Sequence, residues 1–268
     1  MSSIYSGLTL YSRVVEAALL SWFHEHGRDL PWRRTRDPYA ILVSEVMLQQ
    51  TQVDRVVPRY REWLARWPTA DALAAAPLAD VIQAWQGLGY NRRAVSMHRA
   101  ARRIADHGWP DDLTELPGVG PYTAAAVSSF ALGRPVLPVD TNVARVQERT
   151  GGTFSHRSGQ ALMDLGATIC LARIPRCQIC PLAFGCPSRG RRYEPRRAQS
   201  RFEGSFRQRR ARILRLVAEK PRPRSELDAE AVAALERDGL VRRSGELVAL
   251  PARQGSRNQS GNPLSETR

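Results

Sequence analysis

Apolar residues recur at three- and four-residue intervals from Ser12 to about Val217, and this helical period limits the possible fold more than any other feature. The segments LYSRVVEAALLSWF, PYAILVSEVML and YTAAAVSSFAL are typical of it, and no convincing strand alternation interrupts them. Prolines stand at or just before expected helix starts, where a missing N–H costs little. They are Pro38, Pro77, Pro110, Pro121 and Pro138. The sequence therefore predicts an all-α domain.

The chain of 268 residues has a formal net charge of +14, which produces a positive field suited to a polyanionic partner. No apolar run reaches the roughly 20 residues of a membrane-spanning helix, and the N-terminal segment lacks the order of a secretory signal. We therefore expect a nucleic-acid partner, no membrane association, a cytoplasmic, nucleoid-associated location and, by default, a monomer.

Composition divides the chain into a helical domain (1–190), a basic linker (191–204), a small extension (205–251) and a disordered tail (252–268). Within the extension, two helical patterns precede a short strand pair that turns at Ser244-Gly245. This order favours a small winged-helix-like unit. A helical cap packed on the main domain is the alternative.

All four cysteines lie in one loop-rich segment, residues 170–186. Their spacing is Cys170-x6-Cys177-x2-Cys180-x5-Cys186. Cysteines in a disulfide framework or in a hydrophobic core would be more widely spread, so the pattern indicates a single metal site. Four thiolates at this spacing are compatible with either tetrahedral zinc or a 4Fe-4S cluster.

A glycine-rich turn, Leu116 to Pro121, lies between two helical patterns. Gly118, Val119 and Gly120 form its centre, where glycine lets successive N–H groups point outward. Such a turn at the start of a helix binds a phosphate without needing lysine. With the high positive charge, the pattern favours a DNA-binding helix-hairpin-helix over a plain Gly-Pro turn.

Two carboxyl residues are candidates for catalysis. Glu45 lies within the apolar segment PYAILVSEVML, where desolvation raises a carboxyl pKa and makes a general acid. A glutamate neutralised by a buried arginine is the alternative. Asp140 opens a helical segment, so it is also a candidate N-cap. One protonated acid and one ionised partner are what cleavage of a glycosidic bond requires.

With these residues in place, the chain resembles the helix-hairpin-helix glycosylase superfamily and, within it, MutY-type adenine DNA glycosylases. The resemblance covers roughly residues 30–187 and rests on LPWRRTRDPYAILVSEVMLQQTQV, WQGLGYNRRA, LPGVGPYTAAAV, VDTNVARV, ALMDLGATIC and the cysteine spacing. It implies a 4Fe-4S cluster on the four cysteines. It also implies removal of adenine from double-stranded DNA that contains A:8-oxoguanine or A:G mispairs.

The resemblance further implies roles for individual residues. Glu45 matches the acid that protonates adenine N7, and Asp140 matches the carboxylate that faces the sugar cation. Asn142 matches the residue that orients the water, and Tyr122 the active-site tyrosine. The expected adenine pocket consists of Leu30, Trp32 and Arg33. The residues expected to wedge the duplex and contact 8-oxoguanine are Leu48, Gln50, Thr51, Leu88 and Tyr90.

The sequence departs from this family at two places. Thr141 stands where glycine is usual, with little expected effect on the chemistry. The family's Nudix-like C-terminal domain is not expected in residues 205–251, which are too short and have the wrong element order. Preference for 8-oxoguanine over guanine is therefore expected to be weaker, or to rest on Gln50, Thr51 and Tyr90.

Two rival functions remain open. A thymine glycosylase that acts on T:G mismatches also carries a tyrosine at the position of Tyr122. A catalytically silent DNA-binding protein needs neither Glu45 nor Asp140. A lyase step through a Schiff base is not expected, because Lys220 is the only lysine in the chain.

Overall fold

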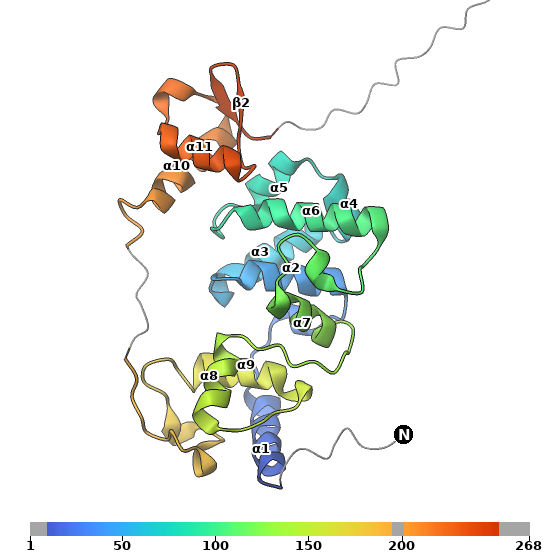
Figure 1. Ribbon diagram of the computed structural model, residues 1–268, viewed down its shortest axis with the longest axis vertical. Coiled ribbons are helices and arrows are strands. Elements are labelled where there is room, and N and C mark those ends of the chain that lie inside the picture. The colour runs from blue at the N-terminus through green and yellow to red at the C-terminus, as the bar shows by residue number, and fades with distance from the viewer. Residues whose placement is uncertain (1–9, 195–200, 252–268) are drawn as a thin grey trace, which may run out of the picture.

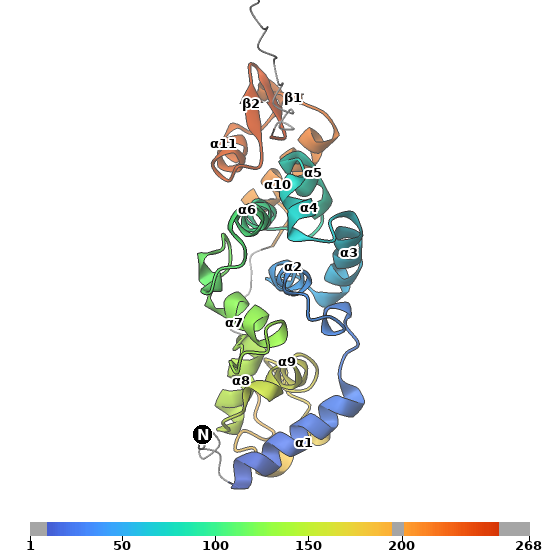
Figure 2. The same cartoon turned by 90° about the vertical axis from the view of Figure 1, so that its right-hand side faces the viewer.

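A computed structural model of the protein describes residues 10–194 and 201–251. These residues are predominantly helical, which confirms the predicted fold class. The elements form three groups along the long axis of the molecule (Figures 1 and 2). The tail expected in residues 252–268 and part of the expected linker, residues 195–200, lie outside the described residues, and the four-part domain division stays a prediction.

The middle group is built around one helix that is buried on nearly all sides, α2 (Pro38–Leu48). The core of the middle group contains Trp63, whose ring packs edge-on against Trp67 and Trp85 at centroid distances of 4.7 and 5.4 Å. The surrounding helices are α3 (Val53–Arg66), α4 (Ala70–Ala75), α5 (Leu78–Trp85), α6 (Arg92–His107) and α7 (Pro121–Phe130).

A second group combines the N-terminal helix with helices from much later in the chain. It consists of α1 (Leu10–His26), α8 (Thr141–Thr150) and α9 (Gly159–Thr168), which lie together in Figure 2. Leu19 and Leu162, both fully buried, belong to its shared core. The chain thus leaves this group after α1 and returns to it at α8, so residues of both groups can line one site.

The third group contains α10 (Phe206–Glu219), α11 (Ala229–Arg237) and a sheet of β1 (Arg222–Pro223), β2 (Arg242–Ser244) and β3 (Leu247–Ala249). The antiparallel sheet has the order β1-β3-β2, and the predicted turn at Ser244-Gly245 connects β2 to β3. Ile82 of α5 and Val95 of α6 join its core. The extension therefore has a winged-helix order and is also packed on the middle group.

The predicted hairpin turn precedes α7, and its shape requires glycine at one position. Gly118 has φ +82°, and a Cβ added there would lie 2.6 Å from Cβ of Ser96. The turn therefore packs closely on α6, and any side chain at residue 118 would push it away.

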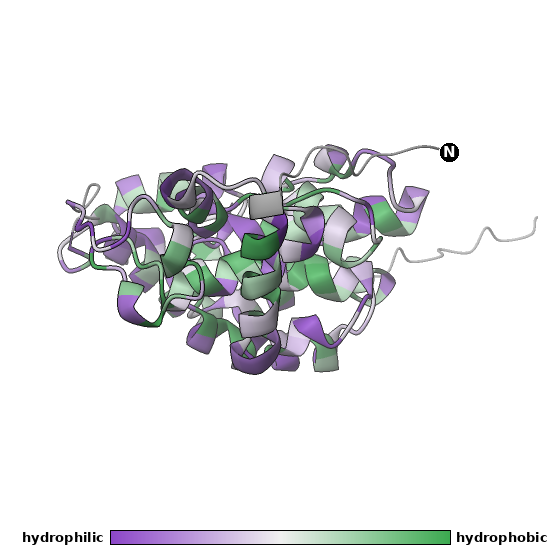
Figure 3. Ribbon diagram, turned by 90° about the horizontal axis from the view of Figure 1, so that it is seen from below, coloured by the Kyte–Doolittle hydropathy of each residue, from purple (hydrophilic) through white to green (hydrophobic). Residues whose placement is uncertain are grey.

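Hydrophilic residues gather on the outside of the helices and hydrophobic residues between them (Figure 3). Within residues 10–194 and 201–251, every helix is too short or too polar to cross a bilayer.

The core of the third group predicts a stability effect. Leu214 of α10 is 1% exposed. Leu214→Ala is expected to lower the free energy of unfolding by about 2–5 kcal/mol, because it removes buried methyl groups and leaves a cavity. Urea denaturation followed by circular dichroism measures this. The exposed neighbour substitution Arg212→Ala is the control, with little change expected; an equal loss in both variants would contradict the assigned core.

Candidate active site

Three elements from two groups meet at the candidate site. Glu45 comes from the buried helix α2, Tyr122 from the first turn of α7, and Asp140 from the N-cap of α8. Tyr122 donates a hydrogen bond to Glu45, and the charge of Asp140 acts on both. The fold thus brings together residues that are up to 95 positions apart in the sequence.

Glu45 has the properties of a protonated acid near neutral pH. Its side chain lies among apolar residues and is 5% exposed. Burial, reinforced by the nearby Asp140 charge, raises the pKa of Glu45 to about 7, although the Tyr122 hydrogen bond and the Arg33 charge act in the opposite direction. Burial and the two carboxylates also raise the pKa of Tyr122, which therefore keeps its proton.

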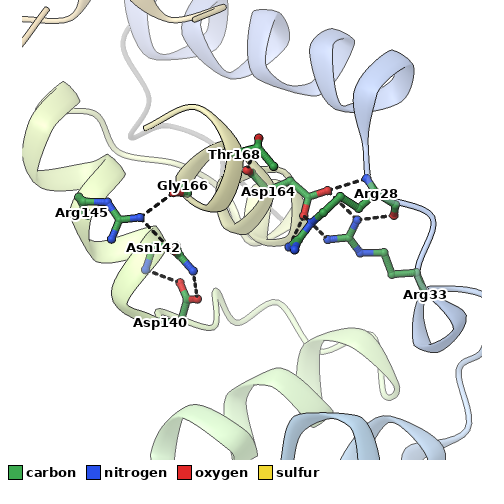
Figure 4. Close-up of polar contacts among 8 residues, drawn as sticks. All are labelled: Arg28, Arg33, Asp140, Asn142, Arg145, Asp164, Gly166 and Thr168. Carbon is green, nitrogen blue, oxygen red and sulfur yellow. Dashed lines mark hydrogen bonds and ion pairs between the residues drawn. The ribbon is translucent and has the colours of Figure 1, made fainter. Parts of the chain in front are cut away.

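The guanidinium of Arg33, whose charge is outweighed by burial at Glu45, binds another carboxylate directly. Asp164 of α9, whose side chain is fully buried, accepts hydrogen bonds from both terminal nitrogens of Arg33 at 2.7 Å. It also accepts bonds from the backbone N–H of Arg28 at 2.8 Å and from its Nε at 2.7 Å (Figure 4). Burial alone would raise the pKa of Asp164, but these bonds outweigh burial and hold the pKa below its usual value.

Asp140 is both the predicted N-cap and a member of the site. Its Oδ1 accepts the backbone N–H groups of Asn142 and Val143 at 2.9 and 2.7 Å, and its Oδ2 accepts the Asn142 amide at 2.8 Å (Figure 4). These bonds, together with the positive end of the α8 dipole, fix an anionic carboxylate at the helix start. Thr141, which lies between Asp140 and Asn142 in the sequence, is exposed. Its side chain takes part in none of these three hydrogen bonds.

Arg145 joins α8 to α9 and to the cysteine loop. It donates to Oδ1 of Asn142 at 2.6 Å, to the Gly166 carbonyl at 2.7 Å and to the Cys170 carbonyl at 2.8 Å. A Cβ at Gly166 would lie 2.5 Å from Cβ of Asn142, so only glycine permits this approach of the two helices. The orientation of Asn142 is therefore fixed by the contact with α9.

A cavity of about 300 Å3, at the lower end of the usual range for ligand pockets, is lined by Arg33 but not by Glu45, Tyr122 or Asp140. Two of the three predicted pocket residues, Trp32 and Arg33, line it, whereas Leu30 is buried in the middle core. Other lining residues could not be predicted from the sequence, because they come from distant elements and form no local motif. Among them are Phe23, Phe130, His156 and Gln160.

The predicted DNA-contacting residues divide into exposed and buried ones. Gln50 and Tyr90 are exposed at loop tips, and Thr51 and Leu48 are half-buried next to Gln50. Leu88 and Val119 are only 3% and 6% exposed, so their side chains pack in the core. The side chains of Leu88 and Val119 are therefore not available to a DNA partner, contrary to what the sequence predicted for Leu88.

The four cysteines line one cavity at the end of α9. Arg149 approaches Sγ of Cys170 at 3.5 Å, and the backbone N–H of Gly190 donates to Sγ of Cys177 at 3.3 Å. Among the residues that the structure describes, no three His, Cys, Asp or Glu side chains converge closely enough to hold one metal ion. The thiols are thus spread around the cavity.

Comparison with known proteins identifies the family. Residues 43–165 match the HhH-GPD superfamily of base excision DNA repair proteins. The adenine DNA glycosylase of Mycobacterium tuberculosis is 42% identical over 86% of this chain and 91% of its own. The chain belongs to the adenine DNA glycosylases of the HhH-GPD superfamily. The human adenine DNA glycosylase is 39% identical over 65% of this chain but only 39% of its own, longer chain.

Solved structures agree with the fold of this adenine DNA glycosylase family member. A thermostable thymine-DNA glycosylase has a TM-score of 0.60 and 28% identity, and it covers 66% of this chain and 95% of its own. An endonuclease III trapped as a covalent DNA intermediate has a TM-score of 0.56 and 25% identity, and it covers 65% of this chain and 93% of its own. After the cysteine loop, the described residues form α10, α11 and a small three-stranded sheet, and a Nudix-like fold is absent from the described segments.

The Asp164 ion pairs predict a large effect on stability. Asp164→Asn leaves Arg28 and Arg33 uncompensated and is expected to lower the free energy of unfolding at pH 7 by about 3–5 kcal/mol. Because folding lowers the pKa of Asp164, its stabilisation is present above the ordinary value of 3.8 and is lost as pH falls through the folded-state value. Urea denaturation at several pH values should therefore show that the difference in free energy of unfolding between the wild type and Asp164→Asn becomes smaller in acid.

The control for this substitution is Asp29→Asn, which removes a carboxylate from an exposed pair with Arg34. Little change is expected there, because solvent screens exposed ion pairs. A small effect of Asp164→Asn, similar to that of the control, would contradict the structural role of the buried carboxylate.

Proposed function

We propose that this protein is a monofunctional DNA glycosylase that removes adenine mispaired with 8-oxoguanine or guanine by hydrolysis of the N-glycosidic bond. The observation that carries the proposal is a buried Glu45 with a pKa near 7, next to the carboxylate of Asp140. The 42% identity to an adenine DNA glycosylase over most of both chains supports adenine as the base.

The mechanism starts with a proton transfer. Glu45 gives its proton to N7 of the flipped adenine, the bond between N9 and C1′ breaks, and its electron pair leaves with the base. Asp140 stabilises the positive charge that develops on the sugar. Water positioned by Asn142 then adds to C1′, and its proton restores Glu45. The product is free adenine and an abasic site.

Adenine must leave the stack before this reaction, a step that is easiest at a mispair. Gln50 and Tyr90 are exposed on neighbouring loops and are the residues assigned to wedge the duplex, with Thr51 and Leu48 beside them. The backbone N–H groups around Gly118 and Gly120 bind a phosphate. We assign the adenine pocket to the cavity lined by Trp32 and Arg33, because the charge of Arg33 also acts on Glu45.

No lysine is available for strand cleavage. The only lysine, Lys220, ends α10 in the extension, and Tyr122 occupies the hairpin helix next to Glu45. A Schiff base at C1′ needs an amine, so the reaction stops at the abasic site.

The donor chemistry of the cysteine cavity supports a 4Fe-4S cluster, because all four cysteine sulfurs of the chain line it. The residues that would hold it are Cys170, Cys177, Cys180 and Cys186. When bound, the cluster supplies a rigid anchor for a loop rich in arginine. Arg149 and the Gly190 N–H lie next to the sulfurs, where they offset negative charge.

The test of the function is single-turnover base release from duplexes that carry A:8-oxoguanine, A:G, T:G or A:T, with and without alkali. We expect adenine release from the first two, with strand breaks only after alkali. Thymine release from T:G would support the other glycosylase class, which the similarity to a solved thymine-DNA glycosylase keeps as a rival. Tight binding without release would indicate a silent DNA-binding protein.

The acid assignment predicts a pH profile. Since Glu45 acts when protonated, the rate should be constant at acidic pH and fall above about 7, approaching about tenfold per pH unit. Tyr122→Phe removes a hydrogen bond that lowers the pKa of Glu45, so the midpoint of the pH–rate profile should move to higher pH.

The variant Glu45→Gln tests the same assignment without a pH series. It should keep mismatch binding and lose base release; full turnover of this variant would contradict the assignment of Glu45 as the acid.

The cysteine site predicts a metal content. Purified protein is expected to contain about four irons per chain and to absorb visible light. Cys177→Ser should lower both, whereas Ser188→Ala, at a serine that lines the same cavity, should change neither. Stoichiometric zinc without iron would contradict the cluster.

A further inference from the structure

Two residues of the candidate wedge have an unusual backbone. Among non-glycine residues in the described part of the chain, only Gln50 and Tyr90 have positive φ, at 56° and 46°. Such left-handed conformations cost free energy for residues with a Cβ and persist only where the surroundings enforce them. The two residues are 40 positions apart, so one local turn cannot explain both.

A single side chain, Arg93 of α6, connects the two loops. Its Nη1 donates to the carbonyls of Val46, Met47 and Gln49 at 2.7, 3.1 and 2.7 Å. Its Nη2 donates to Oγ1 of Thr51 at 3.1 Å and to the carbonyls of Leu88 and Gly89 at 3.3 and 3.0 Å. One guanidinium thus binds both sides of Gln50 and the segment directly before Tyr90.

The same guanidinium lies near two aromatic rings and is half-buried. Its centre is 5.2 Å from the Trp85 ring and 5.6 Å from the Tyr90 ring. Burial lowers the pKa of Arg93 to about 10, so the side chain stays charged at neutral pH. The carbonyls of Val46 and Met47 end α2, where unpaired helix carbonyls carry partial negative charge.

We propose that Arg93 is a positioning residue that holds Gln50 and Tyr90 as one preformed wedge, and that it acts on base flipping rather than on bond cleavage. The proposal rests on the proposed function. Within the described part of the chain, Arg93 forms its hydrogen bonds with the two loops and the end of α2 and not with Glu45, Asp140 or Asn142, so it acts on DNA only through the loops it fixes. A lysine cannot replace it, because one ammonium lacks the planar fork that serves two loops at once.

The test compares a paired with an unpaired adenine. Single-turnover release is measured with saturating enzyme on a duplex with A:8-oxoguanine and on one with adenine opposite an abasic analogue, where little unstacking is needed. For Arg93→Lys we expect the rate on the paired adenine to fall at least about tenfold and the rate on the unpaired adenine to change far less. The pH midpoint should stay that of the wild type, since Glu45 is unaffected.

Arg92→Lys is the matched control, because Arg92 is the adjacent residue of α6 but is 75% exposed and faces Asp238 of the extension. It should behave as the wild type on both duplexes. Thermal unfolding of all variants accounts for loss of folded protein. Equal losses of rate on both adenines, or no loss on either, would overturn the proposal.

A second readout does not depend on cleavage. In a Glu45→Gln background, 2-aminopurine at the target position reports unstacking by its fluorescence. The fluorescence increase on binding should be reduced by Arg93→Lys and kept by Arg92→Lys; an unchanged increase in both would overturn the proposal. If the wild type releases no adenine from any duplex, the proposed function fails, and this measurement still decides the role of Arg93.

Discussion

The buried carboxylate of Asp164 is the interaction on which the candidate site depends. It lies in α9 of one helix group and binds Arg28 and Arg33 of the segment that leads to the other group. Arg33, which Asp164 binds, lowers the pKa of Glu45, but burial outweighs this charge and keeps that pKa raised. A single ion-pair network therefore connects α9 with the segment between α1 and α2 that carries Arg28 and Arg33.

Helix α9 also stabilises the second carboxylate of the site. One of its faces carries Asp164, and its Gly166 carbonyl accepts Arg145, which in turn orients Asn142 beside Asp140 (Figure 4). Arg145 contacts the Cys170 carbonyl as well. The cysteine loop and the candidate site therefore share one set of hydrogen bonds.

Arginine performs several different tasks in this protein. Exposed arginines supply much of the positive charge that favours binding to a polyanion. Arg33, Arg93 and Arg145 are partly buried and each bind more than one backbone or side-chain oxygen. A planar guanidinium with five donors can satisfy several carbonyls at once, which lysine cannot do. Near absence of lysine from the sequence is consistent with this use.

The sequence alone determined the features that depend on neighbouring residues. Helical period predicted α2 and α7, the glycines predicted the hairpin, and the spacing of Cys170 to Cys186 predicted a common site. Tertiary structure alone decided which groups meet across the fold. Asp164 lies 131 positions from Arg33, and Arg93 lies 44 from Gln49, and neither pair forms a local pattern. The same reason explains the burial of Leu88, because exposure depends on how α5 and α6 pack and not on the residue itself.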